Sequence, residues 1–416
     1  MESRQYDVVI IGAGIVGTMV ARTLSKYNLS IAVLEREPDV GMGQSTANSA
    51  ILHSGHDPMP GTIKALMNKR GNELWRGIAE ELSIPLLDTG AMVVAIGKEE
   101  AEGIQALYDR AQENGIPGVE IWDGKQALQQ EPHLSADCTG ALWTPTAGVV
   151  DPFEGVLGAA ENAAENGVAF YMSTEVQGMV VEEGTLRAVK TNNGEFRARW
   201  FVNAAGVHCD DIMHMAGDRP DFSIRARRGE YFIFDKSRVH ISNVLFPMPS
   251  EKGKGTLVAV TAHGNTLIGP NALEVREKDD TSVTKEGLHE ILSNSTRLVP
   301  SLSPKDVIAT FAGVRATGNY KPDGENRDFL IEISGSVGGL IHLAGIESPG
   351  YVSAPAIAEE VVRLLIEEAG EELTERREFN PRRPPRIRFA ELDHDERAEL
   401  IAKNPAYGRI VCRCEE

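Results

Sequence analysis

Residues 48–58, NSAILHSGHDP, combine small side chains with two histidines, His53 and His56. A second run of small residues, GMGQSTA at 41–47, stands directly before them. Loops this rich in small residues let the backbone come close to a ligand. An imidazole has an ordinary pKa of about 6.5, so a histidine there can take up a proton near neutral pH. Taken alone, however, hydrogen bonds within the loop explain the two histidines better.

A glycine-rich turn near the N-terminus carries a second chemical pattern, G-x-G-x-x-G at Gly12, Gly14 and Gly17. An apolar run precedes it, helical spacing follows it, and Glu35 ends the next apolar run. In this setting the pattern indicates dinucleotide binding. Gly12 makes the tight turn, Gly14 lets the backbone approach a pyrophosphate, and Gly17 lets helix and strand pack closely. The helix N-terminus favours the phosphate charge, and Glu35 accepts hydrogen bonds from a ribose.

Length and composition restrict the class of protein. The chain has 416 residues, which predicts two domains. Its 42 basic and 61 acidic residues give a net charge of −19, which argues against nucleic acid as a general partner. An anionic substrate would need a local basic pocket. We expect no transmembrane segment and no signal peptide, because no apolar run reaches the roughly 18 residues of a spanning helix.

Cysteine usage indicates the redox compartment. Four cysteines, Cys138, Cys209, Cys412 and Cys414, are too few for a disulfide framework in a chain of this length. We therefore expect a cytoplasmic protein, with peripheral membrane association only through a partner.

The elements that position these residues alternate between strand and helix at both ends of the chain. Helical patterns cover 61–83, 99–115 and 151–167, and Asp151 is the expected N-cap of the last. A region richer in strands, about 220–320, lies between. We therefore expect an α/β chain, α+β overall. Its Rossmann-like dinucleotide domain should be discontinuous in sequence, with an inserted, mostly antiparallel β-sheet substrate domain.

Eight segments in order along the chain resemble a known family. The chain is similar to the FAD-dependent oxidoreductases of the D-amino-acid-oxidase and glycine-oxidase superfamily. Within it, the nearest branch is that of glycerol-3-phosphate dehydrogenases and oxidases, with L-2-hydroxyglutarate dehydrogenase as a neighbour. The segments, which span residues 6 to about 368, are VVIIGAGIVGTMVARTLSKY, NSAILHSGHDPMPGTIKA, VVDPFE, FVNAAG, RRGEYFIFDK, HGNTLIGP, FAGVRA and LAGIESPGYVSAPAIA.

The resemblance implies an FAD cofactor, which we expect to be bound without a covalent link. The FAD-binding domain would comprise 1–85, 145–220 and 310–370, and the substrate domain 86–144 and 221–309. The residues expected to contact FAD are Gly12, Gly14, Ile15, Gly17, Glu35, Arg36, Ser45, Thr46, Asn48, Ser49, Val176, Ala205, Gly206, Gly345, Ser348, Gly350 and Tyr351.

The same resemblance suggests roles in catalysis. His53 matches the family histidine that faces the substrate, and Arg315 matches the arginine aimed at a substrate phosphate or carboxylate. Oxidising a secondary alcohol removes a hydride and a proton; the flavin takes the hydride, and a neutral imidazole suits the proton. His56 has no such match and is expected to be structural.

Further contacts with a small anionic substrate are expected from Lys254, Ser348 and Tyr231. Lys252 competes with Lys254, and Lys321 offers another charge, although surface lysines explain all three equally well or better. A helix beginning within 348–353 would direct its positive end at the reduced flavin.

The charged segment 371–416 is expected to be a linker followed by a short helix. It ends in a Cys-x-Cys at Cys412 and Cys414, which resembles half of the ligand set of a small [2Fe-2S] domain. A cluster needs four ligands, so we expect a truncated or remnant domain and no metal in this chain.

Three functions remain open at the level of sequence. The first is oxidation of sn-glycerol 3-phosphate to dihydroxyacetone phosphate, and the second is oxidation of an L-2-hydroxy acid such as 2-hydroxyglutarate. The third is a non-catalytic FAD-binding subunit of an electron-transfer assembly. The electron acceptor, whether oxygen, a quinone or a partner protein, is left open too.

Overall fold

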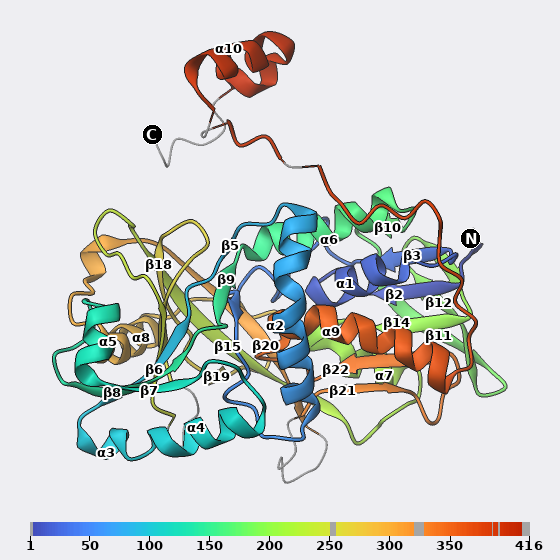
Figure 1. Ribbon diagram of the computed structural model, residues 1–416. Helices are drawn as coiled ribbons and strands as arrows, with labels where there is room; N and C mark the ends of the chain where they lie inside the picture. The colour runs from blue at the N-terminus through green and yellow to red at the C-terminus, as the bar shows by residue number, and fades with distance from the viewer. Residues whose placement is uncertain (1–2, 250–254, 320–327, 385, 390–391, 410–416) are drawn as a thin grey trace.

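The computed structural model describes residues 3–249, 255–319, 328–384, 386–389 and 392–409. Two large sheets lie side by side, one at each end of the molecule (Figure 1). Lys252, Lys254, Lys321, Cys412 and Cys414 fall outside the described residues.

The sheet that holds the glycine-rich turn has six strands in the order β10-β3-β2-β14-β22-β21. All neighbours are parallel except β21 and β22. A parallel sheet is stable only when both faces are covered, which explains the apolar runs in its strands. The strands are β10 (Ala169–Tyr171), β3 (Ile31–Leu34), β2 (Val8–Ile11), β14 (Trp200–Asn203), β22 (Leu340–Ala344) and β21 (Leu330–Ile333).

Helices cover one face of this sheet. The helix after the glycine turn, α1 (Ile15–Leu24), packs against α6 (Pro152–Glu165) and α9 (Gly350–Arg363). The long helix α2 (Ile63–Leu82) crosses α9 (Figure 1). As expected, the Asp151 side chain caps α6 by accepting from the N–H groups of Phe153 and Glu154. A π-helical turn, Leu364–Glu368, continues α9.

The other face is covered by a four-stranded sheet and the short helix α7 (Cys209–Met215). Apolar side chains from both sheets form one core, with Phe196 and Phe201 fully buried. The four strands, in sheet order, are β1 (Ser3–Gln5), β13 (Gly194–Arg197), β12 (Thr185–Thr191) and β11 (Val176–Glu182).

The second large sheet has nine strands, mostly antiparallel. Each face carries its own hydrophobic core, and helices α3 (Lys98–Ala101), α4 (Ile104–Glu113), α5 (Gly124–Gln130) and α8 (Lys285–Leu298) pack around it. Its strands are β19 (Leu273–Glu274), β15 (Ser223–Phe234), β18 (Thr266–Gly269), β17 (Leu257–Val260), β16 (Val244–Pro247), β6 (Ala91–Ile96), β8 (Cys138–Thr144), β7 (Glu120–Asp123) and β20 (Val307–Asn319).

The expected fold class is confirmed: an α/β unit with a mainly parallel sheet is joined to a mostly antiparallel sheet. The expected domain boundary at residue 310 falls inside β20, however. This strand pairs with β15 from Val307 to Asn319, so residues 310–319 lie in the nine-stranded sheet. The extended pairing with β15 explains why β20 joins that sheet and not the parallel one.

A small sheet joins the two units. It contains β4 (Ile51–Leu52), β9 (Gly148–Val150) and β5 (Leu86–Leu87). The loop with His53 and His56 follows β4 directly, so its start is fixed by backbone pairing with β9.

The C-terminal segment is docked along part of its length. Arg383 is buried and contacts Glu154 at 2.8 Å and Glu161 at 2.6 Å. Beyond it, α10 (His394–Lys403) lies away from the rest of the molecule (Figure 1). Among the described residues, no helix has the length and apolar character needed to cross a membrane, and no metal-binding cluster of His, Cys, Asp and Glu occurs.

Candidate active site

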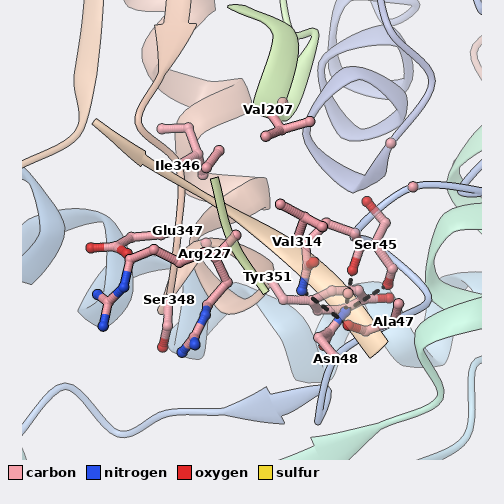
Figure 2. A pocket seen from close by; sticks show the side chains of 18 of the residues that line it. Ser45, Ala47, Asn48, Val207, Arg227, Val314, Ile346, Glu347, Ser348 and Tyr351 are labelled. Atoms are coloured by element: carbon pink, nitrogen blue, oxygen red, sulfur yellow. Dashed lines mark hydrogen bonds between the residues drawn. The ribbon is translucent and has the colours of Figure 1, made fainter. Parts of the chain in front are cut away.

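A cavity of about 1870 Å³ lies between the two large sheets and is lined by residues from both (Figure 2). One wall comes from the glycine turn, the loop 41–53 and the start of α9. The opposite wall comes from β15, β16 and β20 of the nine-stranded sheet. A ligand in this cavity would contact both units.

The glycine turn leaves room only for hydrogen at two positions. Gly12 has φ +103°, and a Cβ there would lie 2.6 Å from the carbonyl oxygen of Ala204. A Cβ on Gly17 would lie 2.0 Å from the carbonyl oxygen of Gly12. The absence of side chains therefore brings the N-terminus of α1 against the end of β2, where it faces the cavity.

Glu35 lies at the end of β3 and lines the same part of the cavity. Its carboxylate accepts hydrogen bonds from the backbone N–H of Ala13, at 2.7 Å, and of Glu37, at 3.0 Å. The next residue, Arg36, pairs with Asp279 from the other unit and contacts His208 Nε2 at 3.0 Å. The pair of Arg36 and Asp279 therefore links the two units at the end of the cavity that the glycine turn borders.

The loop 41–49 is tied by its own polar side chains. The Ser45 hydroxyl accepts from the N–H of Ile15 at 2.8 Å, and Thr46 donates to the carbonyl of Gly41 at 2.8 Å. Asn48 Nδ2 donates to the carbonyls of Gln44 and Ser45 (Figure 2). These residues line the cavity and also position the backbone that borders it.

His53 is partly buried in the cavity wall. Asn68 and Asn72 donate to its carbonyl oxygen at 2.7 and 3.1 Å, and its ring stacks on Phe246 with centroids 5.5 Å apart. His56, in contrast, is only 5 % exposed and its Nδ1 lies 2.9 Å from the Ser54 hydroxyl oxygen. Of the two histidines, His53 therefore lines the cavity, whereas His56 is buried beside it and does not belong to the lining.

Arg315 faces the cavity from β20. Its Nη2 donates to the carbonyl of Asn271 at 2.6 Å, which fixes one side of the guanidinium. Tyr231 also lines the cavity, but it is 2 % exposed and stacks on Phe311 with ring centroids 4.6 Å apart. Burial raises the pKa of Tyr231 to about 12, against a smaller lowering by Arg315, so the phenol stays protonated at neutral pH.

Helix α9 begins at Gly350, within the expected range, and its first residues line the cavity. Tyr351 is held there by stacking on Trp75 and by donating to the carbonyl of Pro152 at 3.0 Å. The positive end of the helix dipole is therefore directed at the ligand space, together with Ser348.

Most of the residues expected from the sequence meet in this one cavity. Gly17 and Gly345 do not line it: Gly17 packs on Gly12, and Gly345, with φ +66°, packs on Gly318. Those that line it are Gly12, Gly14, Ile15, Glu35, Arg36, Ser45, Thr46, Asn48, Ser49, His53, Val176, Ala205, Gly206, Tyr231, Arg315, Ser348, Gly350 and Tyr351.

The structure adds cavity residues that the sequence patterns missed. Phe246 supports His53, and Arg227 lies opposite Arg315 on β15. Glu347 is a largely buried carboxylate that pairs with Lys64 Nζ at 3.0 Å. Burial raises its pKa, but Lys64 and a hydrogen bond from Thr317 lower it more, so the net shift is downward.

The cavity fits a dinucleotide on three grounds. The glycine turn excludes side chains where a pyrophosphate would approach, and a helix N-terminus faces that space. Glu35 also lines the cavity, at the end of the next strand, where dinucleotide-binding units carry the acid that binds a ribose. Gln44 Oε1 is buried without a hydrogen-bond partner among the described residues, as expected for a group that meets a polar ligand.

Comparison with known proteins gives a consistent picture. Residues 7–364 match the family described as FAD dependent oxidoreductase. The chain is 39 % identical to a glycerol 3-phosphate dehydrogenase of Caloramator mitchellensis over 99 % of this chain and 84 % of that protein. Human mitochondrial L-2-hydroxyglutarate dehydrogenase is 27 % identical over 85 % of this chain and 87 % of its own.

Among solved structures, the fold is similar to that of dithionite-reduced L-α-glycerophosphate oxidase from Mycoplasma pneumoniae with FAD bound. The TM-score is 0.86 at 30 % sequence identity, covering 93 % of this chain and all of that one.

Proposed function

The chain belongs to the FAD-dependent oxidoreductase family, and we propose that it oxidises sn-glycerol 3-phosphate to dihydroxyacetone phosphate. One observation carries the proposal: a single cavity holds a dinucleotide-binding turn, a histidine and an arginine that suits an anionic group. The 39 % identity to a glycerol 3-phosphate dehydrogenase over almost the whole chain supports the choice of substrate.

In the proposed complex, Gly12, Gly14 and the N-terminus of α1 hold the pyrophosphate of FAD, and Glu35 holds its ribose. The loop 44–49 and the start of α9 border the rest of the cofactor. When bound, FAD supplies the acceptor for the hydride that leaves the substrate carbon. The chain itself has to orient the substrate and accept the remaining proton.

His53 is the proposed proton acceptor. In this role the imidazole would take the hydroxyl proton; with the hydride taken up by bound FAD, the secondary alcohol becomes a ketone and no other bond of the substrate changes. The contact with Phe246 and the two hydrogen bonds to the carbonyl of His53 position the ring at the cavity wall.

Arg315 is the proposed partner of the substrate phosphate, with Ser348 as a second contact. A guanidinium binds phosphate or carboxylate through two parallel hydrogen bonds, and the existing bond to Asn271 orients it. Tyr231 would act as a pocket wall, since it is buried and its pKa is raised.

A second candidate is oxidation of an L-2-hydroxy acid, which the 27 % identity to L-2-hydroxyglutarate dehydrogenases supports. The third hypothesis, a non-catalytic FAD-binding subunit, gains support only if the isolated chain does not oxidise either substrate. We further propose a reducing, cytoplasmic setting, which the free, buried Cys138 and Cys209 support. Oxygen, a quinone and a partner protein are all compatible acceptors.

The test is an anaerobic substrate screen in which bleaching of the flavin absorbance reports reduction. Glycerol 3-phosphate should bleach the flavin rapidly, and L-2-hydroxyglutarate at the same concentration should not. The opposite order would select the second candidate. If neither substrate bleaches the flavin, in protein that retains FAD and is bleached by dithionite, the result would support a non-catalytic FAD-binding subunit.

A further inference from the structure

A ladder of paired residues on β15 and β20 faces the cavity. The register places Arg227 opposite Arg315, Gly229 opposite Gly313, and Tyr231 opposite Phe311. Side chains alternate along a strand, so these three pairs share one face of the sheet. The face is the one that lines the cavity, because Arg227, Arg315 and Tyr231 all belong to its wall.

The middle pair, Gly229 and Gly313, has no side chains for a steric reason. A Cβ on Gly313 would lie 2.3 Å from the carbonyl oxygen of Ala47, and a Cβ on Gly229 would lie 2.6 Å from Pro270 Cβ. The two arginines therefore lie at one end of the ladder and the stacked aromatic rings at the other, and neither strand contributes a side chain between them.

A buried carboxylate and a lysine lie near the arginine pair. Glu347 is the carboxylate next to Arg227, whose charge helps to lower the pKa of that carboxyl. Glu347 is already paired with Lys64 at 3.0 Å, however. In addition, Arg315 Nε is buried and has no hydrogen-bond partner among the described residues.

Resting on the proposed function, we propose that Arg227 is a second anion-binding residue that, with Arg315, selects a dianionic phosphate group over a singly charged carboxylate. Two guanidinium groups on opposite strands suit one compact group with two charges and three terminal oxygens. A lone carboxylate offers two oxygens and one charge, which suit a single guanidinium group. In Figure 2, Arg227 and Ser348 extend into the same part of the cavity.

The competing explanation is that Arg227 serves only to balance Glu347 inside the protein. The two explanations differ in what a substitution changes. A structural partner affects thermal stability and FAD retention, whereas an anion-binding residue affects the affinity for phosphate and the half-saturating concentration of substrate.

The experiment compares Arg227→Gln and Arg227→Lys with Arg225→Gln in the FAD-loaded enzyme. Arg225 is a matched control, because it lies on the same strand, pairs with Glu274 at 3.4 Å, and is absent from the described lining of the cavity. Anaerobic flavin reduction gives the half-saturating concentration of glycerol 3-phosphate. Flavin difference spectra give the dissociation constants of inorganic phosphate and of acetate.

For Arg227→Gln we expect a rise of about 10- to 100-fold in the half-saturating concentration and in the phosphate dissociation constant, as for loss of a charge-assisted contact. The limiting reduction rate and the acetate constant should change by less than about threefold. Arg227→Lys should recover part of the loss, and Arg225→Gln should behave as the parent.

Unchanged phosphate affinity in Arg227→Gln, with or without a lower melting temperature, would overturn the inference. Equal losses for phosphate and acetate would overturn it too, since selectivity would be absent. Failure of the proposed function looks different: glycerol 3-phosphate would not reduce the parent enzyme, while phosphate binding would still depend on Arg227.

Discussion

The ring of His53 lies against the ring of Phe246, with centroids 5.5 Å apart and planes inclined by 29°. His53 follows β4 of the small joining sheet, whereas Phe246 belongs to β16 of the nine-stranded sheet. The proposed base is therefore held between two units that come together only in the folded chain.

Phe246→Leu should slow flavin reduction by about 3- to 10-fold while FAD stays bound. Leucine keeps the site apolar, so the loss reflects the aromatic contact, worth about 0.5–1.5 kcal/mol. Stopped-flow reduction at saturating glycerol 3-phosphate measures the effect, and Phe246→Tyr, which retains the ring, is the control. An unchanged rate in the leucine variant would show that the stacking does not position the imidazole.

Glu35→Ala should weaken FAD retention by about 10-fold or more, because it removes the proposed ribose contact and the acceptor for the N–H groups of Ala13 and Glu37. Flavin lost on gel filtration measures the effect. The flavin should also be non-covalent, so acid precipitation should leave yellow FAD in the supernatant. Retention equal to the parent would remove Glu35 from the cofactor site, and flavin in the pellet would contradict non-covalent binding.

Gly71→Ala and Gly77→Ala form a matched pair within α2. A Cβ on Gly71 would lie 1.9 Å from the carbonyl oxygen of Val352 in α9, whereas a Cβ on Gly77 meets no atom within 4 Å. We expect Gly71→Ala to lower the free energy of unfolding by about 1–3 kcal/mol or more. Gly77→Ala should be neutral or raise it by up to about 1 kcal/mol. Denaturant unfolding gives the free energy of unfolding of both variants. Equal values for the two would contradict the close approach of α2 and α9.

The buried pair His342 and Asp218 should make stability depend on pH. His342 Nε2 donates to Asp218 Oδ2 at 2.8 Å. Burial lowers the pKa of His342, and Asp218 offsets this only in part. The folded state therefore binds fewer protons than the unfolded state, so His342 contributes stability above about pH 6.5 that is lost as pH falls through its lowered folded pKa.

Replacing His342 by Gln should reduce the loss of unfolding free energy between pH 7.5 and pH 5.5 relative to the parent, as measured by urea titrations at both values. The variant will be less stable at pH 7.5 because a buried hydrogen bond is weakened, so the slope with pH is the informative quantity. A slope as steep as that of the parent would show that His342 does not titrate in this way.

The sequence allowed the dinucleotide turn to be predicted because its constraints are local. Gly12, Gly17 and Glu35 lie within one strand-helix-strand unit, and their spacing alone specifies a turn without side chains and an acid at the next strand end. The family resemblance added His53 and Arg315, which the structure places in the same cavity.

Contacts between segments that are distant in the sequence could not be predicted from it. Strand alternation puts Arg227 on the face of Tyr231, but only the pairing of β15 with β20 reveals Arg315 as its neighbour. The same holds for Phe246 against His53 and for Lys64 against Glu347. The pairing of β20 with β15 was not predictable for a similar reason, since local patterns do not say which sheet a strand joins.

The most direct test of the account is anaerobic stopped-flow reduction of the FAD-loaded parent and of His53→Ala by glycerol 3-phosphate across pH. We predict that FAD stays bound in the variant and that its reduction rate falls by about 10²- to 10⁴-fold, as for loss of a general base. The parent rate should itself fall as the imidazole becomes protonated at lower pH. Reduction of His53→Ala at a rate close to that of the parent at every pH would contradict the role of His53 and leave residues 48–58 as a loop that only borders the cofactor.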